Sequence, residues 1–146
     1  LTHAHGDHLF DLERLLEQTG AHPLIGEGEK LTGVKHFAAG AVFSVGSLDV
    51  ETRSTRGHAS GGITYVVRGL ERPVAIVGDA LFAGSMGGAM VSYEDCLETA
   101  VREIFSLPEE TVLCPGHGPL TTVSLERRHN PFFSKLLDER TRGQRA

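Results

Sequence analysis

Hydrophobic side chains recur with the spacing of a helix in several stretches of the chain. Leucines fall on one helical face over residues 9–16, and Gly20 follows them as a stop signal, so we expect a helix over residues 10–19. A capping-box sequence at Ser92 precedes a second apolar row, which predicts a helix that ends before Pro108. Two further helical pieces are expected over residues 123–129 and 132–140.

Other stretches carry the patterns of strands. Residues 48–53 alternate between apolar and polar side chains, which is typical of a strand with one side facing solvent. Residues 74–77 are apolar without interruption, as expected of a buried central strand. The mixed, glycine-containing residues 27–40 favour a loop or an irregular hairpin instead. Strands are also expected over residues 23–26, 63–67 and 111–114.

The composition is that of one globular domain without a membrane span. The chain has 146 residues, of which 40% are hydrophobic, and no apolar run is long enough to cross a bilayer. A formal charge of −5 argues against a nucleic-acid partner, because binding to phosphates needs clustered Lys and Arg. The only cysteines, Cys96 and Cys114, indicate a reducing compartment. We therefore expect a cytoplasmic protein with no nucleic-acid or membrane partner.

The start of the chain crowds three imidazoles and a carboxylate into the stretch from residue 3 to residue 8. Such side chains contribute little to a core, whereas a metal ion holds imidazoles neutral and a carboxylate ionised. On an extended segment His3 and His5 point to the same side, while Asp7 and His8 fall at the following turn and face a neighbouring position. A purification remnant would be homopolymeric, and this stretch is not. The motif predicts two metals rather than one.

Three later positions place a His or an Asp beside glycine at the end of a strand-like run. They are His58, Asp79 and His117. Glycine permits backbone angles that other residues avoid, which lets a ligand loop fold back over an ion. Singly, such a residue is more often solvated or capping than ligating. Together with the first motif, the three positions predict a single centre at which all these ligands meet.

The order of these motifs resembles the metallo-β-lactamase superfamily of metallohydrolases. The matching stretches are THAHGDH, GHASGG, GDALF and PGHGP, and the resemblance runs from residue 2 to about residue 133. Residues 119–132 are similar to the glyoxalase II-like branch that lacks a separate glutathione-binding domain. The resemblance implies one metal on His3, His5 and His58, a second on Asp7, His8 and His117, and Asp79 as a bridge between them.

The resemblance also implies an α/β fold, the αββα sandwich of this superfamily. That sandwich needs a strand and roughly half of its sheets before the first motif, whereas nothing precedes Leu1 and no initiator Met is present. We therefore expect the C-terminal part of a longer protein, with the N-terminal sheet portion absent. A domain over residues 1–133 would be followed by a helix end and tail over residues 134–146. An uncovered apolar sheet face would favour a homodimer or poor solubility.

The expected ligand set decides the chemistry. Imidazoles and carboxylates without a thiolate suit two divalent ions, with zinc first and iron or manganese as alternatives. A pair of cations lowers the pKa of a shared water toward about 7, which supplies a metal-bound hydroxide at neutral pH. Asp7 and Asp79 would orient it, with Asp7 as the better proton acceptor. We expect hydrolysis of an activated acyl bond in a small-molecule substrate, a thioester first and an ester or lactone next.

Two alternatives stay open. The first is a mononuclear iron oxygenase resembling the persulfide dioxygenases, which would use His3, His58 and Asp79. That branch carries an Arg-Thr-Asp stretch in the loop after Asp79, whereas this chain has Gly-Gly-Ala, which favours the hydrolase. The second is a non-catalytic fragment or binding module. All the expected ligand positions are filled, which argues against a degenerate site.

Overall fold

The chain forms an α/β fold with two sheets. The structure, a computed structural model, describes residues 1–143. Its helical elements are a 3-10 turn η1 (Gly6–His8), α1 (Leu12–Thr19), α2 (Tyr93–Thr99) with a π-helical continuation η2 (Ala100–Ile104), α3 (Val123–His129) and α4 (Ser134–Gly143). Its strands are β1 (Leu24–Gly26), β2 (Lys35–Phe37), β3 (Val42–Val45), β4 (Leu48–Ser54), β5 (Ile63–Arg68), β6 (Val74–Gly78), β7 (Val112–Pro115) and β8 (Thr121–Thr122).

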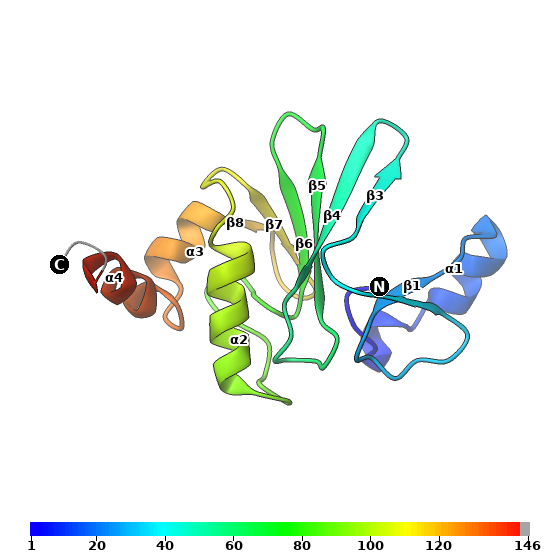
Figure 1. The fold of residues 1–146 in the computed structure, drawn as a ribbon, viewed down its shortest axis with the longest axis horizontal. Coiled ribbons are helices and arrows are strands. Elements are labelled where there is room, and N and C mark those ends of the chain that lie inside the picture. Colours follow the sequence, from blue (N-terminus) through cyan, green and yellow to red (C-terminus); the bar gives the residue numbers. More distant parts are fainter. Residues whose placement is uncertain (144–146) are drawn as a thin grey trace.

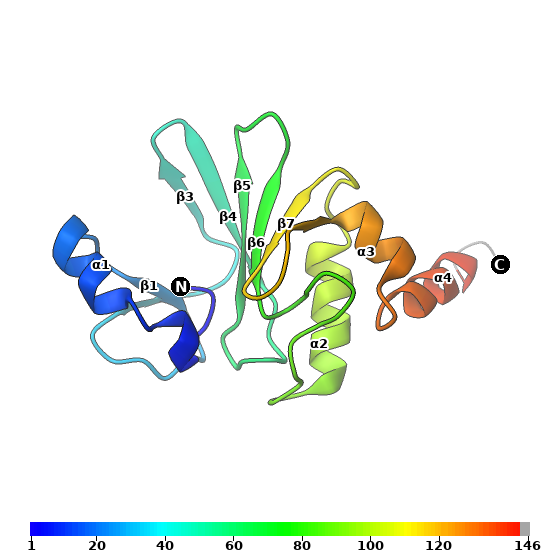
Figure 2. The ribbon, with the colours of Figure 1, turned by 180° about the vertical axis from the view of Figure 1, so that it is seen from behind.

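The larger sheet has six strands in sequence order, β3-β4-β5-β6-β7-β8. Its neighbours are antiparallel except β6 and β7, which run parallel, and β1 and β2 form a separate parallel pair. Helices α2, α3 and α4 lie on one side of the large sheet, and α1 lies with β1 on the other (Figures 1 and 2). Strands β4, β6 and β7 therefore share one direction and end at the same edge.

The hydrophobic core lies between the large sheet and helices α2, α3 and α4. Val66 and Ala75 are fully buried on the strands, and Phe133 packs at 5.1 Å between ring centroids against Phe105. Burial of a Val or Phe side chain of this kind contributes about 1.5–3 kcal/mol. Leu137 of α4 belongs to the same core. The expected boundary near residue 133 stays a prediction, and residues 144–146 of the expected tail lie outside the described residues.

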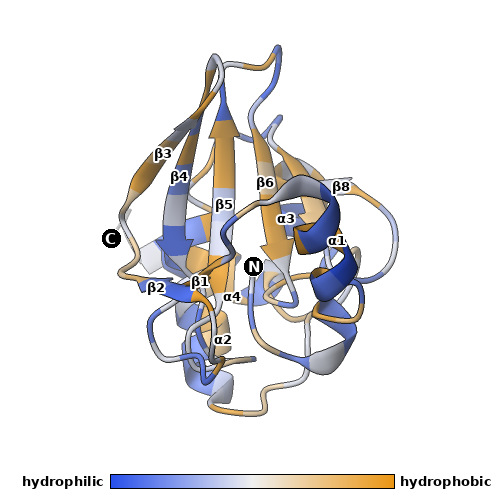
Figure 3. Ribbon diagram, turned by 90° about the vertical axis from the view of Figure 1, so that its right-hand side faces the viewer, coloured by the Kyte–Doolittle hydropathy of each residue, from blue (hydrophilic) through white to orange (hydrophobic). Residues whose placement is uncertain are grey.

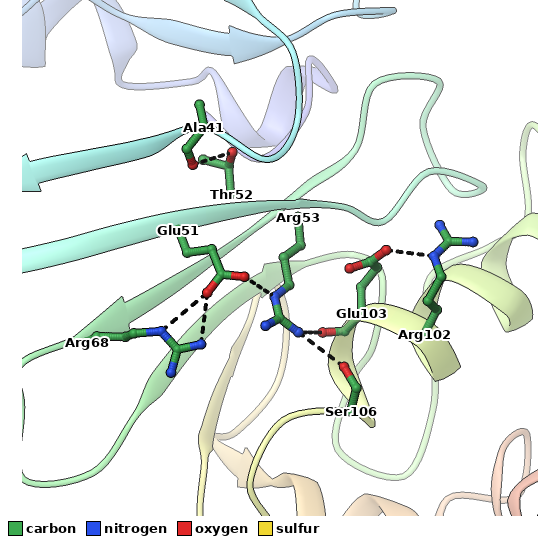
Figure 4. A network of polar contacts seen from close by, with 8 residues as sticks. All are labelled: Ala41, Glu51, Thr52, Arg53, Arg68, Arg102, Glu103 and Ser106. Atoms are coloured by element: carbon green, nitrogen blue, oxygen red, sulfur yellow. Dashed lines mark hydrogen bonds and ion pairs between the residues drawn. The ribbon is translucent and has the colours of Figure 1, made fainter.

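A polar network joins the sheet to the end of η2 (Figure 4). The Arg53 guanidinium donates to the Glu51 carboxylate at 2.7 Å, to the Glu103 carbonyl at 2.9 Å and to the Ser106 hydroxyl at 3.1 Å. Arg68 donates to the same Glu51 carboxylate at 2.8 Å. These hydrogen bonds connect β4 and β5 to each other and to the C-terminal end of η2.

Strands β3, β5 and β6 of the large sheet consist mostly of hydrophobic residues (Figure 3), and part of the face turned toward α1 is lined by apolar side chains. Phe43, Val45 and Val50 border a cavity of about 340 Å³ whose other wall includes Leu12 and Leu16 of α1. Val45 is 61% exposed. The expectations of a homodimer and of a missing sheet portion stay predictions.

Most of the expected elements are present, with corrections at some boundaries. The first helix begins at Leu12 rather than at Phe10, which is 92% exposed. It ends at Thr19, as expected, and Gly20 follows in the left-handed conformation with φ of 65°. Ser92 caps α2, because its hydroxyl accepts from the Asp95 amide at 3.1 Å. The loop or irregular hairpin expected over residues 27–40 is wrong in part, because these residues contain β2, which pairs in parallel with β1. Strand β3 was not expected. No helix in residues 1–143 is long and apolar enough to cross a membrane.

Candidate metal centre

The first motif lies on an extended segment held against β5. The Ile63 amide donates to the Thr2 carbonyl at 2.9 Å, which places the segment along the start of β5. The 3-10 turn η1 follows and closes with the His8 amide donating to the His5 carbonyl at 3.0 Å. This change from extended chain to turn brings Asp7 and His8 round to the side of His3 and His5.

The other three expected residues follow strands that end at the same edge of the sheet. His58 lies in the loop after β4, Asp79 comes directly after β6, and His117 comes after β7. Parallel neighbours deliver the side chains after them to a common edge, which is where binding sites form in α/β sheets. The Gly116 amide donates to the Gly78 carbonyl at 2.9 Å and holds the last two loops together.

Three imidazoles make the first cluster. His3, His5 and His58 each offer one ring nitrogen, and these nitrogens all lie within 4.8 Å of one another. Nε2 of His58 lies 2.9 Å from Nδ1 of His5. On its other side, His58 donates from Nδ1 to the Gly88 carbonyl at 2.7 Å, which leaves Nε2 as the lone-pair atom.

A more exposed trio makes the second cluster. Asp7, His8 and His117 also offer ligand atoms within 4.8 Å of one another. Nε2 of His117 lies 3.0 Å from Oδ2 of Asp7, and Nε2 of His8 lies 3.6 Å from the same oxygen. The side chains of Asp7 and His117 are 57% and 53% exposed, so this cluster faces solvent.

Asp79 lies between the two clusters and touches both. Its Oδ2 is 3.5 Å from Nε2 of His58 and 3.6 Å from Nε2 of His117. Its Oδ1 is 3.1 Å from Nε2 of His8, and its side chain is only 8% exposed. A further grouping within 4.8 Å joins Asp79 with His3 and His8. The structure thus brings together all seven residues expected from the sequence.

The donor atoms of this centre fit metal ions. Nε2 of His3, Nε2 of His8 and Oδ1 of Asp79 are buried and form no hydrogen bond within the described part of the chain, although Nε2 of His8 and Oδ1 of Asp79 lie 3.1 Å apart. Buried polar atoms are normally hydrogen-bonded, so such convergent unpartnered atoms need another partner. Burial, followed by the charges of His8 and His5, lowers the pKa of His3 from 6.5 to about 3. A neutral imidazole is the form that binds a metal.

Two glycines make room for these side chains. A Cβ on Gly116 would lie 2.3 Å from Oδ1 of Asp79 and 2.5 Å from Cε1 of His8. A Cβ on Gly87 would lie 2.9 Å from Nδ1 of His58. Only a residue without a side chain fits at either position, because real Cβ contacts are longer.

Several supporting residues could not be identified from the sequence. Glu126 of α3 and Asn130, the residue that follows this helix, are buried, and both bond to the turn at residues 82–85. In that turn, Phe82 packs edge-on against His117 with ring centroids 5.7 Å apart. No spacing or composition signal joins Asn130 to a loop 45 residues away.

A cavity of about 340 Å³ opens beside the first cluster. His5, His58, Lys30 and Met90 are among the residues that line it. Met90 and Val91, both exposed, line the same cavity from the segment that follows Asp79.

Comparison with known proteins places these motifs in a family. Residues 1–117 match the family described as the Metallo-beta-lactamase superfamily. The probable metallo-hydrolase YqgX of Bacillus subtilis (strain 168) is 30% identical over 158 residues, covering 92% of this chain and 74% of that protein. The hydroxyacylglutathione hydrolase GloC of Haemophilus influenzae is 29% identical over 98 residues, covering 65% of this chain and 45% of that protein.

Solved structures show the same fold. The BLEG-1 B3 metallo-beta-lactamase superposes with a TM-score of 0.80 at 26% identity, covering 92% of this chain and 75% of that one. ETHE1 from Myxococcus xanthus gives 0.75 at 29% identity, covering 89% and 59%. TTHA1623, in a di-iron-bound form, gives 0.71 at 25% identity, covering 91% and 75%.

Proposed function

Because this chain belongs to the metallo-β-lactamase superfamily, we propose that it is a metal-dependent hydrolase that cleaves an activated acyl bond, with thioesters as the substrate class. The observation that carries the proposal is the pair of three-residue clusters on either side of Asp79. The name of GloC, a hydroxyacylglutathione hydrolase, supports the thioester class. The di-iron form of TTHA1623 supports a pair of ions.

Divalent metals are the cofactors of this superfamily, and two ions are proposed here. The first would be held by His3, His5 and His58, and the second by Asp7, His8 and His117, with Asp79 shared between them. Such a pair supplies water that ionises near neutral pH and polarises the carbonyl of the substrate. Zinc is the metal proposed, with iron or manganese as alternatives that the same donor atoms accept.

Two carboxylates of the chain have different proposed roles, proton transfer for Asp7 and orientation of the ligands for Asp79. Asp7 is exposed, so it can take the proton of the attacking water and pass it to solvent. Its pKa is lowered: desolvation raises it, but a backbone N–H together with His8 and His117 outweighs that effect, so the carboxylate is ionised at neutral pH. The buried Asp79 orients the imidazoles around it.

The reaction proposed is ordinary thioester hydrolysis. Water adds to the acyl carbon, the carbon–sulfur bond breaks, and a carboxylate and a thiol leave. The substrate would lie in the cavity beside His5 and His58, where Lys30 supplies a positive charge and Met90 an apolar surface.

A second candidate is a mononuclear iron oxygenase acting on a persulfide, and the likeness to ETHE1 favours it. Its expected ligands, His3, His58 and Asp79, belong to the same centre, with Nε2 of His58 3.5 Å from Oδ2 of Asp79. The two candidates differ in metal number and in the need for oxygen.

One experiment separates them. The chain is reconstituted with zinc and, in parallel, with iron, and thiol release from S-acyl glutathione and S-acyl coenzyme A is followed beside oxygen uptake on glutathione persulfide. We expect thiol release without oxygen uptake, and its loss in His117→Ala. Oxygen uptake by a form that holds one iron per chain, with no thiol release, would overturn the hydrolase proposal.

A further inference from the structure

Glu29 joins the two loops that carry the first metal cluster. It lies in the turn between β1 and β2, outside every motif in the sequence. One carboxylate oxygen accepts from the Ala4 amide at 3.0 Å, and the other accepts from the Gly61 amide at 2.6 Å. Ala4 stands between His3 and His5, and Gly61 is in the loop of His58.

We propose that Glu29 is a positioning residue that sets the affinity of the first metal position by holding the His3–His5 segment to the His58 loop. The inference rests on the proposed metal site. A carboxylate that accepts one backbone N–H on each oxygen fixes both donors in distance and direction, and hydrogen bonds to an ionised acceptor are stronger than neutral ones. The first cluster spans the same two loops, with the closest ring nitrogens 2.9 Å apart.

The backbone around Glu29 is packed closely enough to make this link rigid. A Cβ on Gly61 would lie 2.5 Å from the Glu27 carbonyl oxygen and 2.7 Å from the Glu29 amide nitrogen. A Cβ on Gly26 would lie 2.4 Å from the Gly61 carbonyl oxygen. The turn and the His58 loop therefore touch main chain to main chain, and the Glu29 side chain adds the third partner, the segment with His3 and His5.

Glu29 does not itself belong to the ligand groups. It takes part in none of the clusters formed by the described residues, and both of its oxygens are used by amides. Its effect on a metal ion would pass through the backbone of the two loops, as does that of the outer partners of metal ligands generally. The second cluster takes Asp7 and His8 from the turn that follows the held segment and His117 from the loop after β7. Glu29 bonds to no residue of the His117 loop and so joins no two ligand segments of that cluster, and we therefore expect it to leave the second cluster unchanged.

The test measures the two metal positions separately. His117→Ala removes a ligand of the second cluster and reports zinc binding by the first, and His58→Ala reports zinc binding by the second. Glu29→Gln is then added to each background, and zinc affinity is measured by competition with a chromogenic chelator. The amide keeps the size of the side chain but presents an NH₂ group to one of the two backbone donors.

We expect Glu29→Gln to weaken zinc binding about 10- to 100-fold in the His117→Ala background and to leave it unchanged in the His58→Ala background. Glu27→Gln, on the exposed neighbour in the same turn, controls for lost charge and should change neither affinity. Glu29→Asp keeps the charge but is too short to reach both amides, so it should also weaken the first position. Circular dichroism of each metal-free variant checks that the fold is retained.

Equal zinc affinity with and without Glu29→Gln in the His117→Ala background would overturn the inference, as would an equal loss at both positions. If Glu29→Gln does not fold, Glu29→Asp decides by the same criteria. Failure of the metal site itself looks different, because His117→Ala and His58→Ala would then bind no zinc even with Glu29 in place.

Discussion

At the scale of single residues, the hydroxyl of Tyr65 fixes the start of the ligand segment. It donates to the Leu1 carbonyl at 2.6 Å, two residues before His3. Burial raises the pKa of Tyr65 from 10 to about 12. The hydroxyl therefore holds the N-terminal segment against β5 by a hydrogen bond, and it ionises at a higher pH in the folded chain than in the unfolded chain.

The raised pKa predicts a loss of stability at alkaline pH. In the unfolded chain the phenol ionises near pH 10, whereas in the folded chain it ionises near pH 12, so its contribution is complete below pH 10 and is lost between pH 10 and 12. The denaturation midpoint of the wild type should fall more steeply over that range than the midpoint of Tyr65→Phe. Tyr93→Phe, at an exposed tyrosine, should behave as the wild type. Equal slopes for Tyr65→Phe and the wild type would contradict the assignment.

Functional residues could be predicted from the sequence where several metal-binding side chains lie close together. His3, His5, Asp7 and His8 lie within six residues of one another, so the first motif could be recognised as a group of potential metal ligands before the fold was known. Tyr65 and Glu29 did not stand out, because a tyrosine in a strand and a glutamate in a turn have many ordinary uses. Their roles depend on the segment from Leu1 to Ala4, which lies far from both in the sequence.

At the scale of elements, α3 and the residue after it stabilise the turn that packs against the metal centre. The Asn130 amide donates to the Ser85 carbonyl at 2.9 Å and to the Glu126 carboxylate at 2.8 Å. The same carboxylate accepts from the Gly84 amide at 2.9 Å. Helix α3 therefore holds the turn that carries Phe82 against His117.

Asn130→Ala should lower the free energy of unfolding by about 2–4 kcal/mol, because it leaves buried acceptors without donors. Asn130 is 0% exposed, so water cannot replace the lost amide. Urea denaturation of the metal-free chain measures the change. His129→Ala, on the exposed neighbour, should stay within about 0.5 kcal/mol of the wild type. A loss for Asn130→Ala no larger than that of this control would show that the amide does not hold the turn.

Helices and strands could be predicted where the hydrophobic pattern extends over enough residues to show its period. Strands β4 and β6 form where their hydrophobic patterns predicted them, although β6 is not buried throughout, since Ile76 is 42% exposed. Half of the capping box at Ser92 is formed: the Ser92 hydroxyl accepts from the Asp95 amide, but the Ser92 amide donates to the Gly57 carbonyl instead of to the Asp95 carboxylate. Strand β2 was missed because three residues are too few to show a period, and its pairing with β1 is set by tertiary structure. The π-helical continuation η2 has no sequence signal of its own.

At the scale of the whole molecule, the centre depends on loops brought together by the sheet. His58, Asp79 and His117 follow β4, β6 and β7, which run in one direction. The α/β class was predictable from the resemblance carried by the motifs. The missing portion of the expected αββα sandwich stays a prediction, because an exposed apolar sheet face does not identify what covers it. The cytoplasmic location also stays a prediction.

The most direct test of this account is the metal content of the reconstituted chain. Zinc per chain is measured by inductively coupled plasma mass spectrometry after desalting, for the wild type, His58→Ala and His117→Ala. The account predicts two ions in the wild type and one in each variant, because each substitution removes a ligand of a different cluster. A wild type without stoichiometric metal, or variants that keep the wild-type content, would contradict it.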